Sequence, residues 1–323
     1  MNKYTKAGLT ALAGSLVAVS AAQADWSVSG SGKMSYTTKG GSADTAASGS
    51  GLGIDRDISI AGSMEMDNGW AVSSGYTIDN GTGSNQNLKV DMGAMGSLKY
   101  NVQDGDLGIG KIDDMMPTAD EEASNGLSDA GDVSTGSDGF DYVLSVADWT
   151  VGLGYNPRGQ DDAGQQTGGQ GGASGSGASE SSIYVTGSPM ENLTVGYGVG
   201  TTQNATTIVN TNDVSTAFAK YAYNNITVGY QISDVDYDAA GGTDVTSTRY
   251  SIAYQINDDL SISYGEIVND LTGLTSDEEM SGFSIGYSMG GMTIKAHANK
   301  QDNRAGAATA DYEHTEIAVS FAF

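Results

Sequence analysis

Residues 193–200 read LTVGYGVG, and along them apolar residues alternate with small or polar ones. Val195, Tyr197 and Val199 fall on one face of such a segment, whereas the intervening positions carry threonine and glycine. Successive side chains of a β-strand point to opposite faces, so a period of two is the strand pattern. The segment therefore predicts a strand with one apolar face and one face of small or polar residues.

The same alternation recurs along the chain, as in ITVGYQIS (226–233), FSIGYSMG (283–290) and EIAVSFAF (316–323). No run keeps the period of about 3.6 residues that a helix requires. We therefore predict about sixteen strands. Their expected bounds are 26–38, 52–66, 70–79, 85–93, 97–103, 139–147, 149–156, 179–187, 193–202, 213–223, 226–235, 244–256, 260–269, 277–288, 292–301 and 310–323.

Short turns are expected to alternate with longer loops. Asn, Asp and Gly mark the short connections and suit hairpin turns of about two to five residues. The short turns are expected at 67–69, 94–96, 147–148, 188–192, 224–225, 257–259 and 290–291. The longer loops, rich in Gly, Ser, Asp and Thr, are expected at 40–51, 80–84, 104–138, 157–178, 203–212, 236–243, 270–276 and 302–309. An antiparallel sheet with short turns at one end follows from this order.

A closed transmembrane β-barrel explains both the alternation and the polar composition. In lipid every backbone group needs a partner, so the sheet must close, and a spanning strand needs about 9–11 residues. Trp70 and Trp149 follow short turns, where an aromatic girdle belongs, although cross-strand packing in a β-sandwich is an alternative explanation. We expect an all-β, transmembrane, antiparallel up-and-down β-barrel with both chain ends on the short-turn side.

The composition excludes several classes of protein. The chain has 40 Asp and Glu residues against 14 Lys and Arg, for a net charge of -26. A nucleic-acid-binding protein needs a basic surface that releases counterions from phosphate, so nucleic acid is excluded as a partner. Because there is no cysteine, disulfide scaffolds and cysteine-based metal or redox sites are excluded as well.

The first 24 residues have the pattern of a secretory signal peptide. Lys3 and Lys6 precede a stretch of apolar and small residues, 7–22, and Ala22-Gln23-Ala24 forms an A-x-A cleavage site. The stretch is too short for a transmembrane helix. We predict that residues 1–24 are cleaved as a signal peptide and that 25–323 form the mature barrel.

The two ends of the mature chain carry a family resemblance. The sequence ADWSVSGSGKMSY (24–36) opens it, and the final EIAVSFAF places Ile317, Val319, Phe321 and Phe323 on one face. With the expected strand number and order, these features resemble the general porins of the Gram-negative outer membrane, of the α-proteobacterial type. The resemblance covers essentially the whole mature chain.

Several expectations come from this resemblance alone. Such porins are homotrimers of sixteen-stranded barrels, lie among outer-membrane lipids and lipopolysaccharide, and pass small hydrophilic solutes and ions. The barrel-assembly machinery reads their terminal aromatic residue, which assigns Phe321 and Phe323 to the assembly signal. Their third loop, after the fifth strand, folds into the barrel and narrows the pore.

The third loop corresponds here to residues 104–138 and is strongly acidic. Lys111 is its only base. The expected pore constriction comprises Asp104, Asp106, Asp113, Asp114, Asp120, Glu121 and Glu122; Asp129, Asp132 and Asp138 add to the charge. Leu107, Ile109, Ile112, Met115 and Met116 offer apolar contacts to the barrel wall. A solvated external flap that only shares the overall acidity of the chain is the alternative.

Strand phase assigns most bases to the lumen wall. A charge that faces lipid costs about 2–4 kcal/mol at the bilayer midplane, so bases are expected to point inward. The inward positions are those of Lys33, Lys89, Lys99, Lys220, Arg249 and Lys295. Arg56 instead shares the outward phase of Ile54 and Ile58, unless a β-bulge reverses it.

These charges lead to an expectation about function. Acidic groups on an in-folded loop opposite basic groups on the wall would set up a transverse field across a water-filled constriction. We expect an outer-membrane porin for passive diffusion of small hydrophilic solutes and ions, with a preference for cations. A structural or adhesive outer-membrane barrel without an open pore is the alternative. The acidic excess also suits a saline habitat.

No enzyme site is expected. The only histidines are His297 and His314, and no Ser-His-acid spacing accompanies them. Residues 105–111 fit the pattern GxxxxGK, but Ile112 replaces the Ser or Thr that a phosphate-binding loop needs.

No cofactor and no built metal site are expected either. Asp234, Asp236 and Asp238 imitate the start of a calcium loop, but Ala239 and Val245 occupy the positions of its turn glycine and its bidentate glutamate. Loosely bound Ca²⁺ between acidic loops is the one cation site that the sequence leaves open.

Overall fold

The computed structural model describes residues 25–42, 48–102, 107–133, 139–156, 179–203, 211–238 and 242–323. The predicted signal peptide, residues 1–24, lies outside this part of the chain. The strands are β1 (Asp25–Gly40), β2 (Gly49–Glu65), β3 (Ala71–Asp79), β4 (Thr82–Asp91), β5 (Ser97–Val102), β6 (Gly139–Val146), β7 (Trp149–Asn156), β8 (Glu180–Met190), β9 (Leu193–Gln203), β10 (Thr211–Tyr223), β11 (Ile226–Tyr237), β12 (Val245–Asn257), β13 (Leu260–Leu271), β14 (Glu278–Met289), β15 (Met292–Asp302) and β16 (Tyr312–Ala322). Three short 3-10 helices accompany them: η1 (Gly93–Met95), η2 (Gly108–Ile112) and η3 (Arg304–Gly306).

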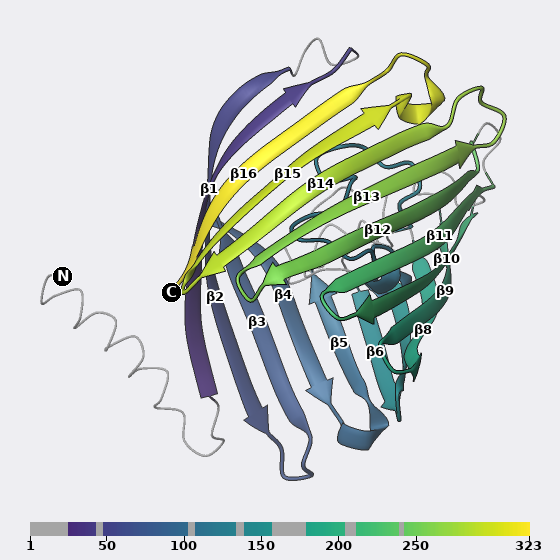
Figure 1. Cartoon of the computed structure of the whole chain (residues 1–323). Helices are drawn as coiled ribbons and strands as arrows, with labels where there is room; N and C mark the ends of the chain where they lie inside the picture. Colours follow the sequence, from purple (N-terminus) through teal and green to yellow (C-terminus); the bar gives the residue numbers. More distant parts are fainter. Residues whose placement is uncertain are drawn as a thin grey trace, which may run out of the picture.

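Each strand pairs with its neighbour in sequence, and β1 pairs with β16 to close the barrel. All pairings are antiparallel, as the ribbon of Figure 1 shows. The last residue completes the closure, because the backbone of Phe323 exchanges two hydrogen bonds with Gly30, of 2.8 and 3.0 Å. The prediction of a closed antiparallel barrel of about sixteen strands is confirmed.

The two faces of the strands differ as the alternation predicts. On β11, Val228 and Tyr230 are exposed on the outside, whereas Gln231 and Ser233 are buried inside. On the outer face, large apolar side chains are exposed to the surroundings of the barrel, as a lipid-facing surface requires. In the described part of the chain, no helix is both long and apolar enough to cross a membrane.

One predicted loop is wrong. Residues 80–84 were expected to form a longer connection, but β3 ends at Asp79 and β4 begins at Thr82, so Asn80 and Gly81 alone form the turn. Both have positive φ, 49° for Asn80 and 90° for Gly81. Asn and Gly tolerate this left-handed conformation best, and two such residues make the tight turn that suits twisted hairpins.

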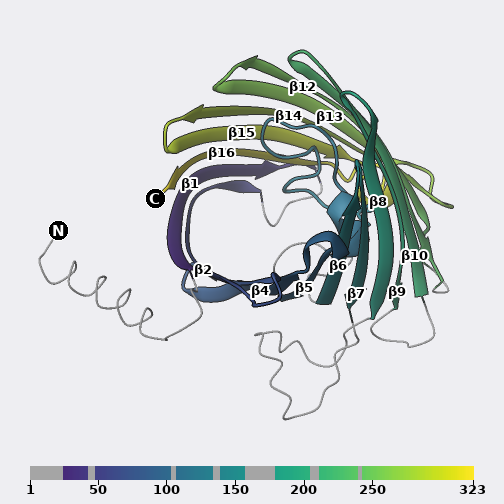
Figure 2. The same cartoon turned by 90° about the horizontal axis from the view of Figure 1, so that it is seen from below.

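The segment 107–133 lies inside the barrel. Figure 2 shows this loop within the outline of the strands, nearer to β8 and β12–β16 than to β1 and β2. The fully buried side chains Leu107, Ile109 and Ile112 belong to it. The loop, rather than the sheet alone, therefore supplies much of the molecule's apolar interior.

Candidate functional site: the loop inside the barrel

The loop begins with an apolar anchor on the inner wall. Ile109 and Ile112 of η2 pack into a cluster with Tyr184 of β8 and with Val214 and Phe218 of β10. These wall residues occupy inward strand positions, where a water-filled barrel usually carries polar groups. The apolar patch on β8–β10 thus marks where the loop is seated.

Polar side chains of the wall form hydrogen bonds with the backbone N–H and C=O groups of the loop. Gln231 of β11 donates from Nε2 to the carbonyls of Ile112 (2.9 Å) and Asp113 (2.6 Å), and its Oε1 accepts from the amide of Met115 (3.0 Å). Buried backbone groups need such partners, and a loop has no ladder to supply them. Other wall residues with the same role are Ser182, Ser251, Ser263, Glu278, Ser284, Asn299 and Gln301.

Glycines on the inner wall give the loop room. A Cβ atom at Gly229 would lie 2.5 Å from Cδ of Pro117, and one at Gly282 would lie 2.9 Å from Cα of Ala123. Real Cβ atoms essentially never approach another heavy atom that closely, so a side chain at either position would displace the loop. Gly154, Gly198 and Gly286 approach the loop in the same way.

Ion pairs fasten the loop to the wall beneath it. The carboxylate of Asp120 forms an ion pair with Nζ of Lys295 at 3.0 Å, and its other oxygen lies 3.1 Å from Nδ1 of His297. Asp129 pairs with Arg249 at 2.8 Å, and both side chains are almost fully buried. Burial favours the neutral form of Asp120, but hydrogen bonds from His297 and Lys295 outweigh it and lower the pKa of its carboxyl. Two of the predicted lumen bases therefore neutralise loop acids.

The two histidines continue the contacts of Asp120 into strands β15 and β16. His297 of β15 and His314 of β16 stack with ring centroids 5.1 Å apart, and Nε2 of His297 lies 3.1 Å from Nδ1 of His314. Both rings are buried under the loop. Asp120, His297 and His314 thus form a chain of hydrogen bonds from the loop to the strand that closes the barrel.

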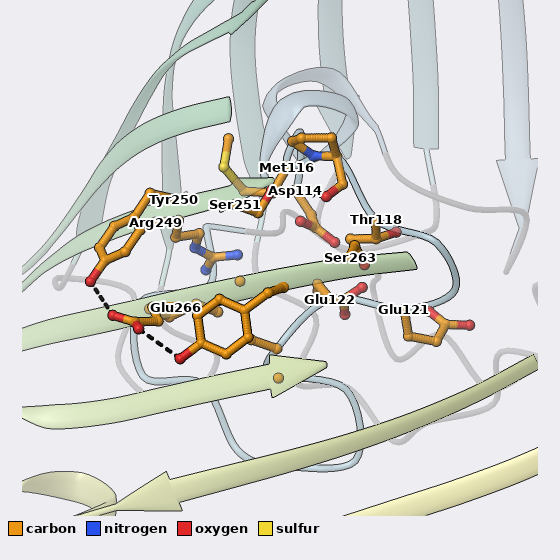
Figure 3. Close-up of a pocket in the computed structure, with 16 residues that line it drawn as sticks. Asp114, Met116, Thr118, Glu121, Glu122, Arg249, Tyr250, Ser251, Ser263 and Glu266 are labelled. Atoms are coloured by element: carbon orange, nitrogen blue, oxygen red, sulfur yellow. Dashed lines mark hydrogen bonds between the residues drawn. The ribbon is translucent and has the colours of Figure 1, made fainter. Parts of the chain in front are cut away.

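Three loop acids make no ion pair with a described base: Asp114, Glu121 and Glu122, which we call the acidic trio. Figure 3 shows them on the loop, beside Ser263 and Arg249 of the wall. Burial raises the pKa of Asp114 to about 7, and the nearby Glu122 carboxylate adds to the shift. Burial, followed by repulsion from Glu122 and Asp120, also raises the pKa of Glu121. The loop thus gathers carboxylates where they repel one another.

The opposite wall carries both signs of charge. The loop contacts strands β6–β16, so β1–β5 form the wall across from it. Lys89 of β4 and Lys99 of β5 are cross-strand partners there. Lys33 of β1 lies 3.7 Å from a carboxylate oxygen of Glu316. Three of the predicted lumen bases, Lys33, Lys89 and Lys99, therefore lie on the uncovered wall.

The same wall holds an acidic group that sequence reasoning missed. Asp55 and Asp57 of β2 and Asp79 of β3 bring carboxylate oxygens within 4.8 Å of one another. Among the described residues, this is the group whose geometry suits a metal ion. Inward phase alone identifies Asp55 and Asp57, because they alternate with Ile54, Arg56 and Ile58, whose side chains are exposed on the outside.

The predicted site residues fall into separate groups. Asp113, Asp114, Asp120, Glu121 and Glu122 lie on the in-folded loop, whereas Asp104, Asp106 and Asp138 lie outside the described residues. Lys111 pairs with Asp141 of β6, within the wall on the loop's own side. Lys220 of β10 is inward, as its strand phase predicts, and lines a pocket beside the loop.

Comparison with known proteins agrees with this architecture. A family model described as Gram-negative porin matches residues 8–323. No curated protein sequence matches the chain.

Solved structures share the fold at low sequence identity. The anion-selective porin from Comamonas acidovorans is 12% identical with a TM-score of 0.67, and the match covers 93% of this chain and 100% of that one. The trimer form of the outer membrane protein OmpT of Vibrio cholerae is 13% identical with a TM-score of 0.66, covering 93% and 99%. A mutant of the Rh. blastica porin is 17% identical with a TM-score of 0.61, covering 93% and 100%.

Proposed function

This chain belongs to the Gram-negative porin family and is a protein of the outer membrane, and we propose that its barrel passes small hydrophilic solutes and ions by passive diffusion, with a preference for cations. A porin lumen is an aqueous path in which pore width and the charges of the lining residues set permeability.

The acidic trio is the observation that carries the cation preference. Asp114, Glu121 and Glu122 stand on a loop inside the barrel, and no described base pairs with them. Inside a narrow water-filled passage, fixed negative charge concentrates cations and repels anions. Asp55, Asp57 and Asp79 on the opposite wall add charge of the same sign. We therefore assign the constriction to the space between the loop and β1–β5.

The bases modify the expected field. Arg249 and Lys295 are engaged by Asp129 and Asp120 on the loop side, whereas Lys33, Lys89 and Lys99 are among the bases of the opposite wall. A transverse field then runs from these lysines toward the acidic trio, with the Asp55 group interrupting it. Dipolar solutes would align in this field as they pass.

The proposal includes the oligomeric state and the membrane insertion that are typical of the family. The protein is a homotrimer among outer-membrane lipids and lipopolysaccharide, and the related fold of OmpT of Vibrio cholerae in its trimer form supports this. Residues 1–24 act as a cleaved signal peptide, and Phe321 and Phe323 are read by the barrel-assembly machinery. No catalytic role is proposed, because His297 and His314 fasten the loop.

A planar bilayer tests the channel and its selectivity together. The mature protein is reconstituted, and conductance and zero-current potential are measured under a KCl gradient. Large conductance steps with a cation-selective potential are expected. An anion-selective potential would remove the cation preference and keep the channel. Folded, inserted protein without conductance would support a structural barrel without an open pore instead.

A matched variant assigns the selectivity to the loop. Glu121→Gln combined with Glu122→Gln removes two lumen charges and should move the zero-current potential toward zero. Glu279→Gln is the control, since this exposed residue of β14 lies on the outer face next to the buried, inward Met280. An equal shift in both variants would contradict the role of the acidic trio.

A further inference from the structure

The pocket that Lys220 lines lies in the lumen, on the short-turn side of the loop. Its volume is about 420 Å³, within the range of about 300–1,000 Å³ typical of small-molecule sites, and part of it is open to the lumen. Pro117 and Thr118 of the loop bound it on one side, and the turn residues Asn192 and Asn225 bound it on the other. Five consecutive strands, β9–β13, supply the remaining wall.

Among the residues that the structure describes, Lys220 is the only charged one that lines this pocket. In the described part of the chain it makes no ion pair and no hydrogen bond, unlike Lys33, Lys89 and Lys295. Its cross-strand partner is Gly229, over which Pro117 packs, so the lysine lies directly beside the loop. No described Asp or Glu lines the pocket, although acidic residues outnumber basic ones 40 to 14 in the chain. The pocket is therefore a locally positive site in an acidic protein.

The other polar groups of the pocket are neutral hydroxyls and amides. The hydroxyls of Thr194, Thr227 and Ser261 line it, and none of them hydrogen-bonds to another described residue. Gln255 and Asn225 stand at its short-turn edge, where Nδ2 of Asn225 donates to the Gln255 carbonyl at 2.9 Å. Hydroxyls both donate and accept, which suits a ligand that carries several hydroxyl groups.

We propose that this pocket is a binding site for small, hydroxylated carboxylate anions, the class that includes sugar acids. The Lys220 ammonium would form a charge-assisted hydrogen bond with the carboxylate, and the three free hydroxyls would bind the hydroxyl groups of the same solute. The site deepens the proposed function, on which it rests, because it names one class of solute that pauses in the channel. It is compatible with a cation-preferring constriction, since the acidic trio limits entry whereas the pocket prolongs residence.

Current block in a planar bilayer tests the site. Galacturonate and galactose are added in turn to a single wild-type channel, because they share a skeleton and differ in the carboxylate. Galacturonate should block at a lower concentration than galactose. Lys220→Gln should raise its half-blocking concentration about three- to tenfold, as expected for losing one charge-assisted hydrogen bond. Lys220→Arg should keep most of the block.

The control is Lys300→Gln, since Lys300 is on the outer face and pairs with Asp302 at 2.8 Å. It should leave the block unchanged. Equal block by galacturonate and galactose would overturn the proposal, as would an unchanged half-blocking concentration in Lys220→Gln.

Binding without conductance is measured separately. Saturation-transfer NMR on the folded protein in detergent should show galacturonate signals that weaken in Lys220→Gln and persist in Lys300→Gln. A barrel that binds in this way but passes no current would disprove the channel and keep the site. A conducting barrel without Lys220-dependent binding would disprove the site and keep the channel.

Discussion

Nδ1 of His297 lies 3.1 Å from Oδ2 of Asp120, so a strand near the chain end holds a loop residue 177 positions earlier. Asp120→Asn should loosen the loop, because it removes the ion pair with Lys295 and weakens the contact with His297. Hydrogen bonds to charged groups contribute about 1.5–3 kcal/mol, less where water screens them, as at the half-exposed Lys295. Hydrogen exchange should quicken at 119–126 and not in the strands. Asp302→Asn, on the outer face, is the control; equal effects would contradict the tether.

Acid should release the same tether. The folded-state pKa of Asp120 is lowered, so its contribution to docking is complete above the unfolded value of about 3.9 and is lost as pH falls through the folded pKa. Channel closures or current noise should therefore increase below about pH 4 in the wild type. Asp120→Asn should show that noise already at neutral pH. Noise that rises with acid identically in both proteins would argue for another titrating group.

Cation preference should depend on pH near neutrality. The pKa of Asp114 is raised to about 7, so its charge appears as pH rises through that value and the loop becomes more negative. The zero-current potential should become more cation-selective from about pH 6 to pH 8. The stability of the docked loop changes in the opposite direction. Because the pKa of Asp114 is raised in the folded protein, the docked loop is favoured when Asp114 is protonated, and this contribution is lost as pH rises through about 7. Asp114→Asn should abolish the change in selectivity; a pH response that survives this substitution would exclude Asp114 as its source.

A methyl group on the inner wall should displace the loop. In Gly282→Ala the new Cβ would lie 2.9 Å from Cα of Ala123 and 2.3 Å from Oδ1 of Asn299, so the loop must move away. We expect an intact, heat-modifiable barrel with altered single-channel conductance. Gly51→Ala is the matched control, because a Cβ on this residue of β2 meets nothing within 4 Å. Unchanged conductance in Gly282→Ala would mean that the loop does not set the bore.

Removing wall lysines should strengthen the cation preference. Lys89 and Lys99 face each other across β4 and β5 on the wall opposite the loop. Replacing both by Gln removes two positive charges from the constriction, which should move the zero-current potential further toward that of a cation-selective pore. Lys300→Gln, outside the barrel, should leave the potential where it is. An unchanged potential would place these lysines outside the conducting path.

A substitution at Phe323 should distinguish folding of the barrel from its assembly into the membrane. The backbone of Phe323 bonds to Gly30, whereas its side chain is 82% exposed. Phe323→Ala keeps the backbone bonds, so refolding in detergent should match the wild type. If the ring is an assembly signal, the amount of protein in the outer membrane should fall in cells. Normal levels in cells would show that the aromatic ring is dispensable.

Alternation made the barrel predictable, because each strand must present one face to lipid and the other to water. It was less informative where the inner wall meets the loop. Ile267 of β13 points inward against Ala123, which puts Glu266 on the outer face, where Tyr264 holds its carboxylate at 2.7 Å. A rule that sends charged residues inward gives the wrong side for Glu266, since the loop changes what the inner face requires.

The ion-pair partners of the lumen bases could not be predicted from the sequence either. Strand phase predicts that Arg249 and Lys295 face the lumen, but it does not give their partners, because the pairing with Asp129 and Asp120 depends on how the loop crosses the barrel. The inward glycines carried the missing signal, because Gly229 and Gly282 leave space that only a second segment fills. The signal peptide and the α-proteobacterial type stay predictions.

The loop's fastenings also fix the order in which the molecule can form. Met115 bonds to Gln231, 116 residues later, and Asn299 bonds to the carbonyl of Glu122, 177 residues earlier. Such remote contacts form late, because the intervening chain must be ordered first. Strands β11–β15 must therefore be assembled before these two contacts can form, whereas the contacts of η2 with β8 and β10 need only the earlier strands. We therefore expect the second half of the loop to dock late in folding, in a step that narrows the lumen and adds no β-structure.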